Sequence, residues 1–64
     1  MIKLKRLNHS EIVINAELIE LVEETPDTVI TLTNGHKMIV MDSAEDVIRK
    51  VVAYKRSIHI GHLE

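Results

Sequence analysis

The sequence contains no cysteine, and this absence removes two ways of stabilising a small chain. A disulfide bond and a thiolate zinc site both need cysteine, so neither is available here. At 64 residues the chain is expected to form one domain, and a domain of that size buries only roughly 60% of the surface that it exposes when unfolded. Self-association into a homo-oligomer is therefore the expected supplement to the core. A cysteine-free chain also fits a reducing compartment, and we expect a cytoplasmic location.

Aromatic residues, glycine and proline are also scarce. Tyr54 is the single aromatic residue, so the core has to be aliphatic. Two glycines do not suffice for a phosphate-binding glycine loop. No apolar run reaches the ~18 to 20 residues of a membrane span, and the N-terminus lacks the continuous apolar segment of a secretory signal. We therefore expect neither membrane insertion nor a targeting segment.

The net charge of −2 conceals blocks of opposite sign. Residues 11–27 carry six acids and no base, whereas bases gather in residues 1–10 and 49–56. A balance of this kind does not favour a polyanionic partner. With a single Tyr there is no stacking platform for bases either, so nucleic acid is not the expected partner.

Residues 28–41 give the strongest fold signal in the chain. Two β-prone runs flank Asn34 and Gly35, which tolerate the positive φ angles of a tight turn. This pattern predicts an antiparallel hairpin with a two-residue turn at Asn34 and Gly35. The return strand at 38–41 is apolar on both faces, so one of its faces is expected at an interface.

The first part of the chain predicts more strands. Residues 1–7 and 11–14 alternate apolar and polar side chains, which indicates a second hairpin. Residues 16–18 are expected to form one helical turn that leads into a strand at 19–24, and a helix over 16–23 is the alternative.

A turn and a helix complete the predicted elements. Pro26 is expected at the first central position of a β-turn, with the Asp27 side chain bonding nearby amides. Asp42 or Ser43, each three residues ahead of an acid, is expected to cap a helix over 43–56. Gly61 is expected to end any regular structure that follows.

These elements together predict an α+β fold. We expect a small curved antiparallel β-sheet of about four or five strands, SH3-like in the limit, with one C-terminal α-helix. Residues 1–56 form the single domain and residues 57–64 a C-terminal tail. The final Leu63-Glu64 resembles the dipeptide that commonly precedes a purification tag, and it carries no weight in the interpretation.

The order of residues resembles that of FlbD-type, or SwrD-like, bacterial flagellar and swarming-motility proteins over residues 1–56. The resemblance rests on the opening Met-Ile-Lys-Leu-Lys-Arg-Leu-Asn, on residues 13–20, on Glu-Glu-Thr-Pro-Asp-Thr-Val-Ile-Thr-Leu-Thr-Asn-Gly at 23–35, and on the Asp-Ser-helix segment from residue 42. The sequence departs from the family pattern at His9, where Gly typically follows the Leu-Asn pair. That departure concerns the type of turn.

The resemblance implies a cytoplasmic protein that supports flagellar motor power and swarming, with motor or stator components as protein partners. It brings no catalytic residue and no cofactor, so we interpret the chain as a non-enzymatic interaction protein. A small nucleic-acid-binding regulator of flagellar gene expression is the alternative. The candidate contact residues lie in the matching motifs and are polar or turn-forming: Asn15, Pro26, Asp27 and Thr28. Fixing local turns explains these residues equally well.

Two other patterns resemble a metal site and a catalytic carboxylate pair, but neither is complete. His59 and His62 would share one face of a helix, yet zinc needs third and fourth ligands and Gly61 lies between them, so no metal site is expected. Glu23 and Glu24 are adjacent on a predicted strand and point to opposite faces, so they cannot flank one substrate. We expect both acids at a solvated strand end.

Overall fold

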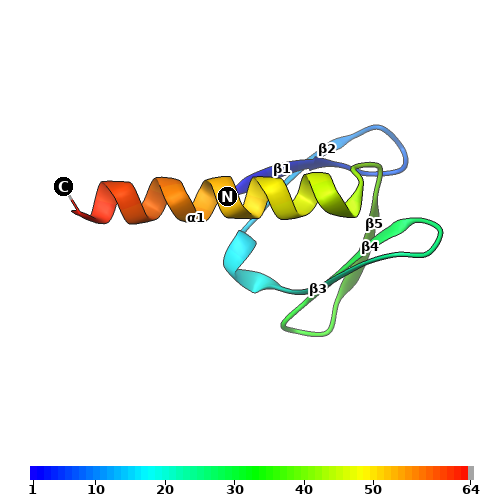
Figure 1. Ribbon diagram of the computed structural model, residues 1–64. Coiled ribbons are helices and arrows are strands. Elements are labelled where there is room, and N and C mark those ends of the chain that lie inside the picture. Colours follow the sequence, from blue (N-terminus) through cyan, green and yellow to red (C-terminus); the bar gives the residue numbers. More distant parts are fainter. Residues whose placement is uncertain (64) are drawn as a thin grey trace.

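The computed structural model describes the main chain of residues 1–63 and the side chains of residues 1–58, arranged as five strands, one short 3₁₀ helix and one long α-helix (Figure 1). The elements in chain order are β1 Ile2–Lys5, β2 Glu11–Ile14, η1 Ala16–Leu18, β3 Ile19–Glu24, β4 Thr28–Leu32, β5 Lys37–Val40 and α1 Ala44–Leu63. The predicted α+β class, with antiparallel strands followed by one helix, is confirmed.

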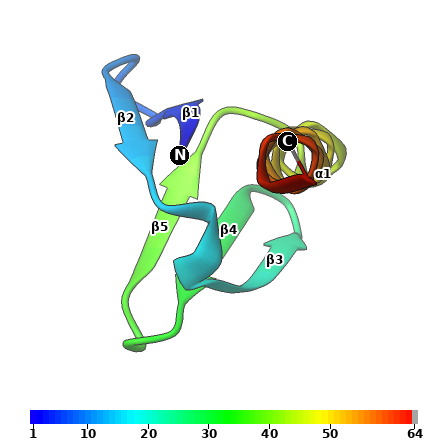
Figure 2. The ribbon, with the colours of Figure 1, turned by 90° about the vertical axis from the view of Figure 1, so that its left-hand side faces the viewer.

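The strands form two antiparallel sheets that meet at one junction. β1 pairs with β2, and β4 lies between β3 and β5. An isolated bridge between Arg6 and Val40 joins the two sheets, and the Met41 amide donates to the Lys5 carbonyl at 2.7 Å beside it. Figure 2 looks along α1, with β1 and β2 to one side of the helix and β3 below it.

The segment after β2 is a 3₁₀ turn followed by a strand, and the alternative helix over 16–23 does not form. Asn15 caps the turn, because its Oδ1 accepts a hydrogen bond from the Glu17 amide at 3.0 Å. The next residues pair with β4, with Val22 opposite Ile30. Pairing with β4 satisfies main-chain groups of the strand and packs Ile19 and Val22 against the core, and a helix of barely two turns could not match this.

The central hairpin is confirmed, but the predicted two-residue turn is wrong. The loop consists of three residues, 33–35, because the Leu32 amide donates to the His36 carbonyl at 2.8 Å and the Gly35 amide donates to the Leu32 carbonyl at 2.9 Å. Asn34 Oδ1 accepts from the His36 amide at 3.0 Å. Only Gly35 takes a positive φ in this loop, of 90°. A three-residue hairpin loop of this kind consists of a type I turn followed by one residue in the left-handed conformation, here Gly35.

The first hairpin closes in the same way. The Arg6 amide donates to the Ser10 carbonyl and the His9 amide donates to the Arg6 carbonyl, both at 2.9 Å. Asn8 Oδ1 accepts from the Ser10 amide at 3.0 Å, as Asn34 does in the other loop. His9 occupies the place of Gly35, with a φ of 70°. The loop therefore puts a histidine where the left-handed backbone favours glycine.

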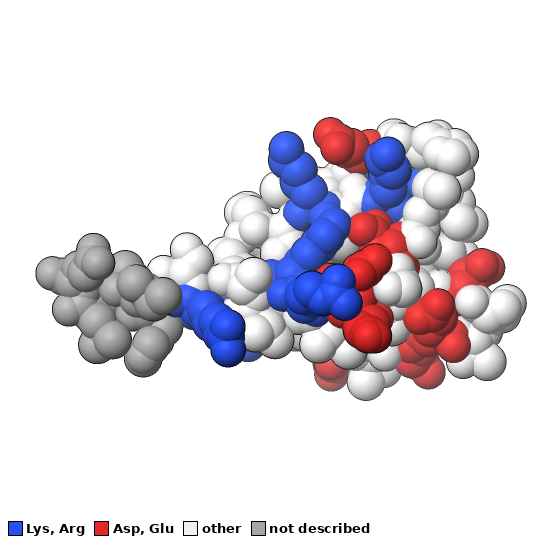
Figure 3. Space-filling model, turned by 45° about the horizontal axis from the view of Figure 1, so that its top comes forward, with Lys and Arg blue, Asp and Glu red and all other residues white. Residues whose placement is uncertain are grey.

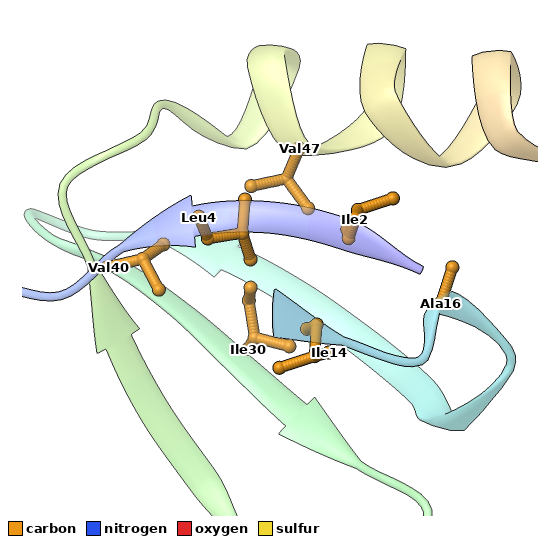
Figure 4. Packing of buried hydrophobic residues seen from close by; sticks show 7 residues of the cluster. All are labelled: Ile2, Leu4, Ile14, Ala16, Ile30, Val40 and Val47. Carbon is orange, nitrogen blue, oxygen red and sulfur yellow. The ribbon is translucent and has the colours of Figure 1, made fainter. Parts of the chain in front are cut away.

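The core is aliphatic, as predicted, and it lies where both sheets meet the helix (Figure 4). Its three largest fully buried side chains come from three elements: Ile30 of β4, Val40 of β5 and Val47 of α1. The other buried hydrophobic residues are Ile2, Leu4, Ile14 and Ala16. Figure 4 shows Val47 pointing from α1 toward the β1 residues Ile2 and Leu4. Neither sheet forms this core without the other.

The helix begins at a serine cap. Ser43 Oγ accepts from the Asp46 amide at 3.1 Å, so of the two predicted caps Ser43 takes this role and Asp42 does not. Glu24 Oε1 accepts from the Ala44 amide at 2.9 Å. The prediction that Glu24 is merely a solvated strand end is therefore incomplete, because the exposed carboxylate also caps the positive end of the helix dipole.

The helix ends later than predicted. It runs through Gly61 to Leu63, and Figure 1 shows its last turns extending past the sheets. Glycine in a helix costs about 1 kcal/mol relative to alanine but keeps its amide and carbonyl for the hydrogen-bond ladder. Since no proline follows, one glycine does not stop the helix.

We predict that His9→Gly stabilises the fold. The left-handed backbone costs a non-glycine residue about 1 to 2 kcal/mol, and the greater freedom of glycine in the unfolded chain returns about 0.5 to 1 kcal/mol of that. Urea denaturation should therefore show a free energy of unfolding about 0.5 to 1 kcal/mol higher. The matched control is Gly35→Ala, which should lose about 1 kcal/mol through the backbone alone, because nothing lies within 4 Å of the added Cβ. A destabilised His9→Gly variant would contradict the interpretation.

Thr31 gives a second stability prediction. It is 6% exposed, and its Oγ1 is buried without a hydrogen-bond partner among the described residues. Thr31→Val keeps the shape and removes the hydroxyl, so the free energy of unfolding should stay unchanged or rise by about 1 kcal/mol. Thr31→Ser keeps the hydroxyl and loses the methyl group, and should destabilise by about 1 kcal/mol. Thermal melts of the two variants check the order, and a Val variant less stable than the Ser variant would refute it.

Candidate functional site

The three-stranded sheet has an apolar face that points away from the core. Ile30 of β4 and Val40 of β5 point into the core. Because neighbouring residues of a strand point to opposite faces, Val29 and Ile39 point away from it. On that side Val29 is paired with Ile39, and Leu21 is paired with Thr31. We call this surface the outer face and define it by Leu21, Val29 and Ile39, with Met41 continuing the alternation just past the end of β5.

The large side chains of the outer face are exposed to solvent. Leu21 is 50% exposed, Ile39 is 42% exposed and Met41 is 47% exposed. Two charged residues of opposite sign, Glu23 of β3 and Lys37 of β5, lie on the same face by alternation. An apolar centre with charged residues around it is the arrangement found at protein contact surfaces. The return strand 38–41, which is apolar on both faces, has one of these faces exposed, with Ile39 and Met41 on it.

The four residues predicted as partner contacts do not form one surface. Asn15 is half-buried and caps η1 before β3, whereas Pro26 and Asp27 are exposed in the loop after β3. Thr28 is 4% exposed and faces the core beside Val40. A partner could not reach Thr28 without displacing core contacts, so Thr28 is not part of the surface proposed below.

The loop between β3 and β4 differs in detail from the predicted turn. The Thr25–Pro26 peptide bond is cis. The bond that closes the loop runs from the Thr25 amide to the main-chain carbonyl of Asp27 at 3.2 Å, and does not use the Asp27 carboxylate. Pro26 and Asp27 are exposed in this loop, which follows the last pair of the register, Glu24 with Thr28.

Sequence reasoning missed Leu21 as a surface residue, and for the return strand it expected one exposed face without saying that this face carries Ile39. Their apolar character alone predicts burial, and only the pairing register shows that they share the outer face with Val29. The signal that could have found them is the apolar return strand combined with the short chain, because a second layer to cover both faces was not available.

A charged cluster fixes the helix to the first strand. Asp42 Oδ1 accepts from the Lys5 amide at 2.8 Å, and Asp42 Oδ2 accepts from Lys50 Nζ at 2.9 Å. Lys50 Nζ also donates to the Lys3 carbonyl at 2.7 Å. Partial desolvation raises the pKa of Asp42, but the hydrogen bonds from Lys5 and Lys50 and the charge of Lys50 together lower this pKa below its ordinary value of 3.8. A carboxylate held in its charged form acts here as a structural anchor.

The bases near this cluster do not form a continuous positive patch. Lys3, Lys5 and Lys50 line a shallow hollow, but Glu11 and Asp42 line the same hollow. Figure 3 shows Lys and Arg side chains interleaved with Asp and Glu on the face turned to the viewer. This face therefore lacks the single-sign field that attracts a polyanion.

No metal centre appears among the described residues, which hold no group of three or more His, Asp or Glu side chains placed to share an ion. The side chains of His59 and His62 lie outside the described part of the chain, so the structure does not test that pair. Within the described residues, no helix has the length and apolar character needed to cross a membrane.

The fold and its surface are those of a small α+β protein with two joined antiparallel sheets, one long helix and an exposed apolar sheet face. Residues 1–59 match the model of the FlbD family of flagellar and swarming motility proteins, and the chain belongs to that family. The resemblance found in the sequence is thus confirmed. No curated protein and no solved structure matches the chain significantly.

We predict that the Asp42 cluster makes stability depend on pH. Because the pKa of Asp42 is lowered by folding, its contribution is present above about pH 4 and is lost as the pH falls through the folded value. Asp42→Asn should lower the free energy of unfolding by about 1 kcal/mol at pH 7, and its stability should fall less steeply than the wild type between about pH 5 and about pH 3.

The matched control is Asp46→Asn, which removes an exposed pair with Arg49 at 3.0 Å. A surface pair of this kind is worth little, so the change should stay within about 0.5 kcal/mol. Guanidinium denaturation at several pH values measures both variants. Equal pH slopes in the wild type and Asp42→Asn would contradict the anchoring role of Asp42.

Proposed function

We propose that the protein is a non-enzymatic accessory of flagellar motility that supports motor power through protein–protein contacts in the cytoplasm. The observation that carries this proposal is the outer face, where Leu21, Ile39 and Met41 are each about half exposed on one side of the sheet. Membership of a flagellar and swarming motility family supplies the process in which the contact serves.

The outer face suits a partner because covering it stabilises a complex. Fully burying a large aliphatic side chain is worth about 1.5 to 3 kcal/mol, so burying the exposed half of Leu21, Ile39 or Met41 contributes roughly 1 kcal/mol each. Glu23 and Lys37 on the same face supply charged rim positions that orient a partner. Pro26 and Asp27 are exposed in the β3–β4 loop, one pair beyond Glu23 and Val29 in the register, and are proposed as rim contacts at that end of the sheet.

The proposed partners are components of the motor, including the stator, together with further copies of this chain. Self-association is proposed because the core is small and large apolar side chains remain exposed on the sheets and on the helix. Nucleic acid is a poorer match, since the net charge is −2 and acids interleave with the bases on the face shown in Figure 3.

The experiment is complementation of a strain from which the gene has been deleted. Leu21→Glu and Ile39→Glu place a charge on the outer face and should abolish most swarming while leaving the protein folded and present at normal levels. Pro26→Ala and Asp27→Ala should reduce swarming less, because they lie at the rim. Swarm expansion rate and immunoblotting are the measurements.

The matched control is Val13→Glu, the same substitution at a residue that is 54% exposed on the other sheet. This variant should swarm like the wild type. Normal swarming of both outer-face variants, or equal loss in Val13→Glu, would remove the outer face as the contact surface. Salt-sensitive retention on heparin would favour the nucleic-acid alternative instead.

A further inference from the structure

The helix α1 has a second stripe of side chains that the core does not use. Its inner stripe includes Val47, which is fully buried, and Val51 and Tyr54, which are partly buried. The second stripe consists of Glu45, Ile48, Val52 and Lys55, spaced three, four and three residues apart on one side of the helix. We call this set the free stripe.

The free stripe is accessible along its length. Ile48 is 55% exposed, Val52 is 47% exposed, and the residues at its two ends are exposed as well. At about 100° per residue, Ile48 lies roughly 100° and Val52 roughly 140° around the helix from Val47. The sheets pack on the Val47 side, so they leave the free stripe open to a partner.

The two ends of the free stripe carry opposite charges. Glu45 stands in the first turn of α1, and Lys55 stands near the end of the part that packs on the sheets. The described residues include ion pairs between Arg49 and Asp46 and between Lys50 and Asp42. Over the same described residues, neither Glu45 nor Lys55 enters an ion pair. Both end charges are therefore available to a partner.

We propose that the free stripe pairs with the free stripe of a second copy, with the two helices antiparallel about a twofold axis near residue 50. Glu45 and Lys55 are both five residues from that axis, and Ile48 and Val52 are both two residues from it. Glu45 then faces Lys55 of the second copy, and Ile48 faces Val52 of the second copy. Each of these contacts occurs twice, as a twofold interface requires.

The order of charges selects the antiparallel arrangement. A parallel pair would set Glu45 against Glu45 of the second copy and Lys55 against Lys55 of the second copy, and like charges in register repel. The antiparallel pair converts both repulsions into attractions. The free stripe is thus complementary to itself, because an acid, two aliphatic residues and a base follow one another along it.

The pairing gives a weak dimer. Residues 44–56 of the two helices overlap along roughly 18 Å at 1.5 Å per residue, which is a small contact surface at the low end of specific interfaces. The dissociation constant of the dimer is therefore expected to be about 10 µM or higher. Added salt should weaken the dimer because the charges are exposed. This inference deepens the self-association named in the proposed function.

Charge reversal tests the pairing by sedimentation equilibrium at low salt. Glu45→Lys and Lys55→Glu should each raise the dissociation constant about threefold to tenfold, because each creates like charges across the interface. The double variant Glu45→Lys/Lys55→Glu should restore it, since the attractions are exchanged. An equimolar mixture of the two single variants should also associate more tightly than either alone.

The mixture separates the interface from effects within one chain. A lysine in the first turn disfavours the helix through its dipole, and circular dichroism of each variant records that effect. Mixing with a second protein cannot repair a defect within one helix, so tighter association in the mixture reports the contact itself. Val52→Glu tests the aliphatic part of the interface and should raise the dissociation constant at least tenfold.

Cysteine cross-linking tests the orientation, and the absence of native cysteine keeps the background clean. Under mild oxidation a mixture of Ile48→Cys and Val52→Cys should form a disulfide between the two different proteins faster than either variant forms one with itself. Faster self-linking of both variants would overturn the antiparallel arrangement. A wild type that stays monomeric at millimolar concentration, or single reversals that leave the dissociation constant unchanged, would overturn the pairing.

The outer-face variants keep this result apart from the motility proposal. Leu21→Glu should dimerise like the wild type, because β3 is not part of the free stripe. Loss of swarming in Leu21→Glu with an intact dimer supports the outer face alone, and failure of the charge-reversal test leaves that result standing.

Discussion

The fold depends on one shared core, into which both sheets and the helix each direct side chains. Val47 of α1 packs against β1 residues and belongs to the same cluster as Ile30 and Val40 of the second sheet. A two-stranded hairpin is at best barely stable in water, and three strands need a covered face. Burying one valine of the helix in this core therefore helps to hold together pieces that would not persist separately, and the Asp42–Lys50 link fixes the helix at this position.

The same small core leaves apolar surface outside. Two small sheets and one helix cannot cover every apolar face, so residues that face away from the core, such as Leu21, Ile39, Ile48 and Val52, stay exposed. They fall into two sets that share no residue, the outer face of the sheet and the free stripe of α1. One set can serve a motility partner while the other joins two copies, because neither surface uses the other's residues.

Much of the fold followed from local patterns. Alternation predicted strands in both hairpins, and the acids three residues after Asp42 and Ser43 predicted a helix that starts at one of these two residues. The turn type was wrong because Asn34 uses its side chain to accept from the His36 amide and does not need a positive φ itself. The end of α1 was wrong because one glycine costs helix stability without breaking the hydrogen-bond ladder. Of the residues predicted as partner contacts, Pro26 and Asp27 are exposed and Thr28 is buried, a difference that depends on the register of β4 and not on residue type.

The sequence by itself determined the α+β class, the aliphatic core, the strand and helix segments and the family, because these depend on residue order, periodicity and composition. The tertiary structure alone decided which apolar residues face outward, since that choice depends on the register between strands and on which side of α1 meets the sheets. It also decided that Asp42 anchors Lys50 and Lys5, because contacts between residues so far apart in the chain arise only when the elements pack.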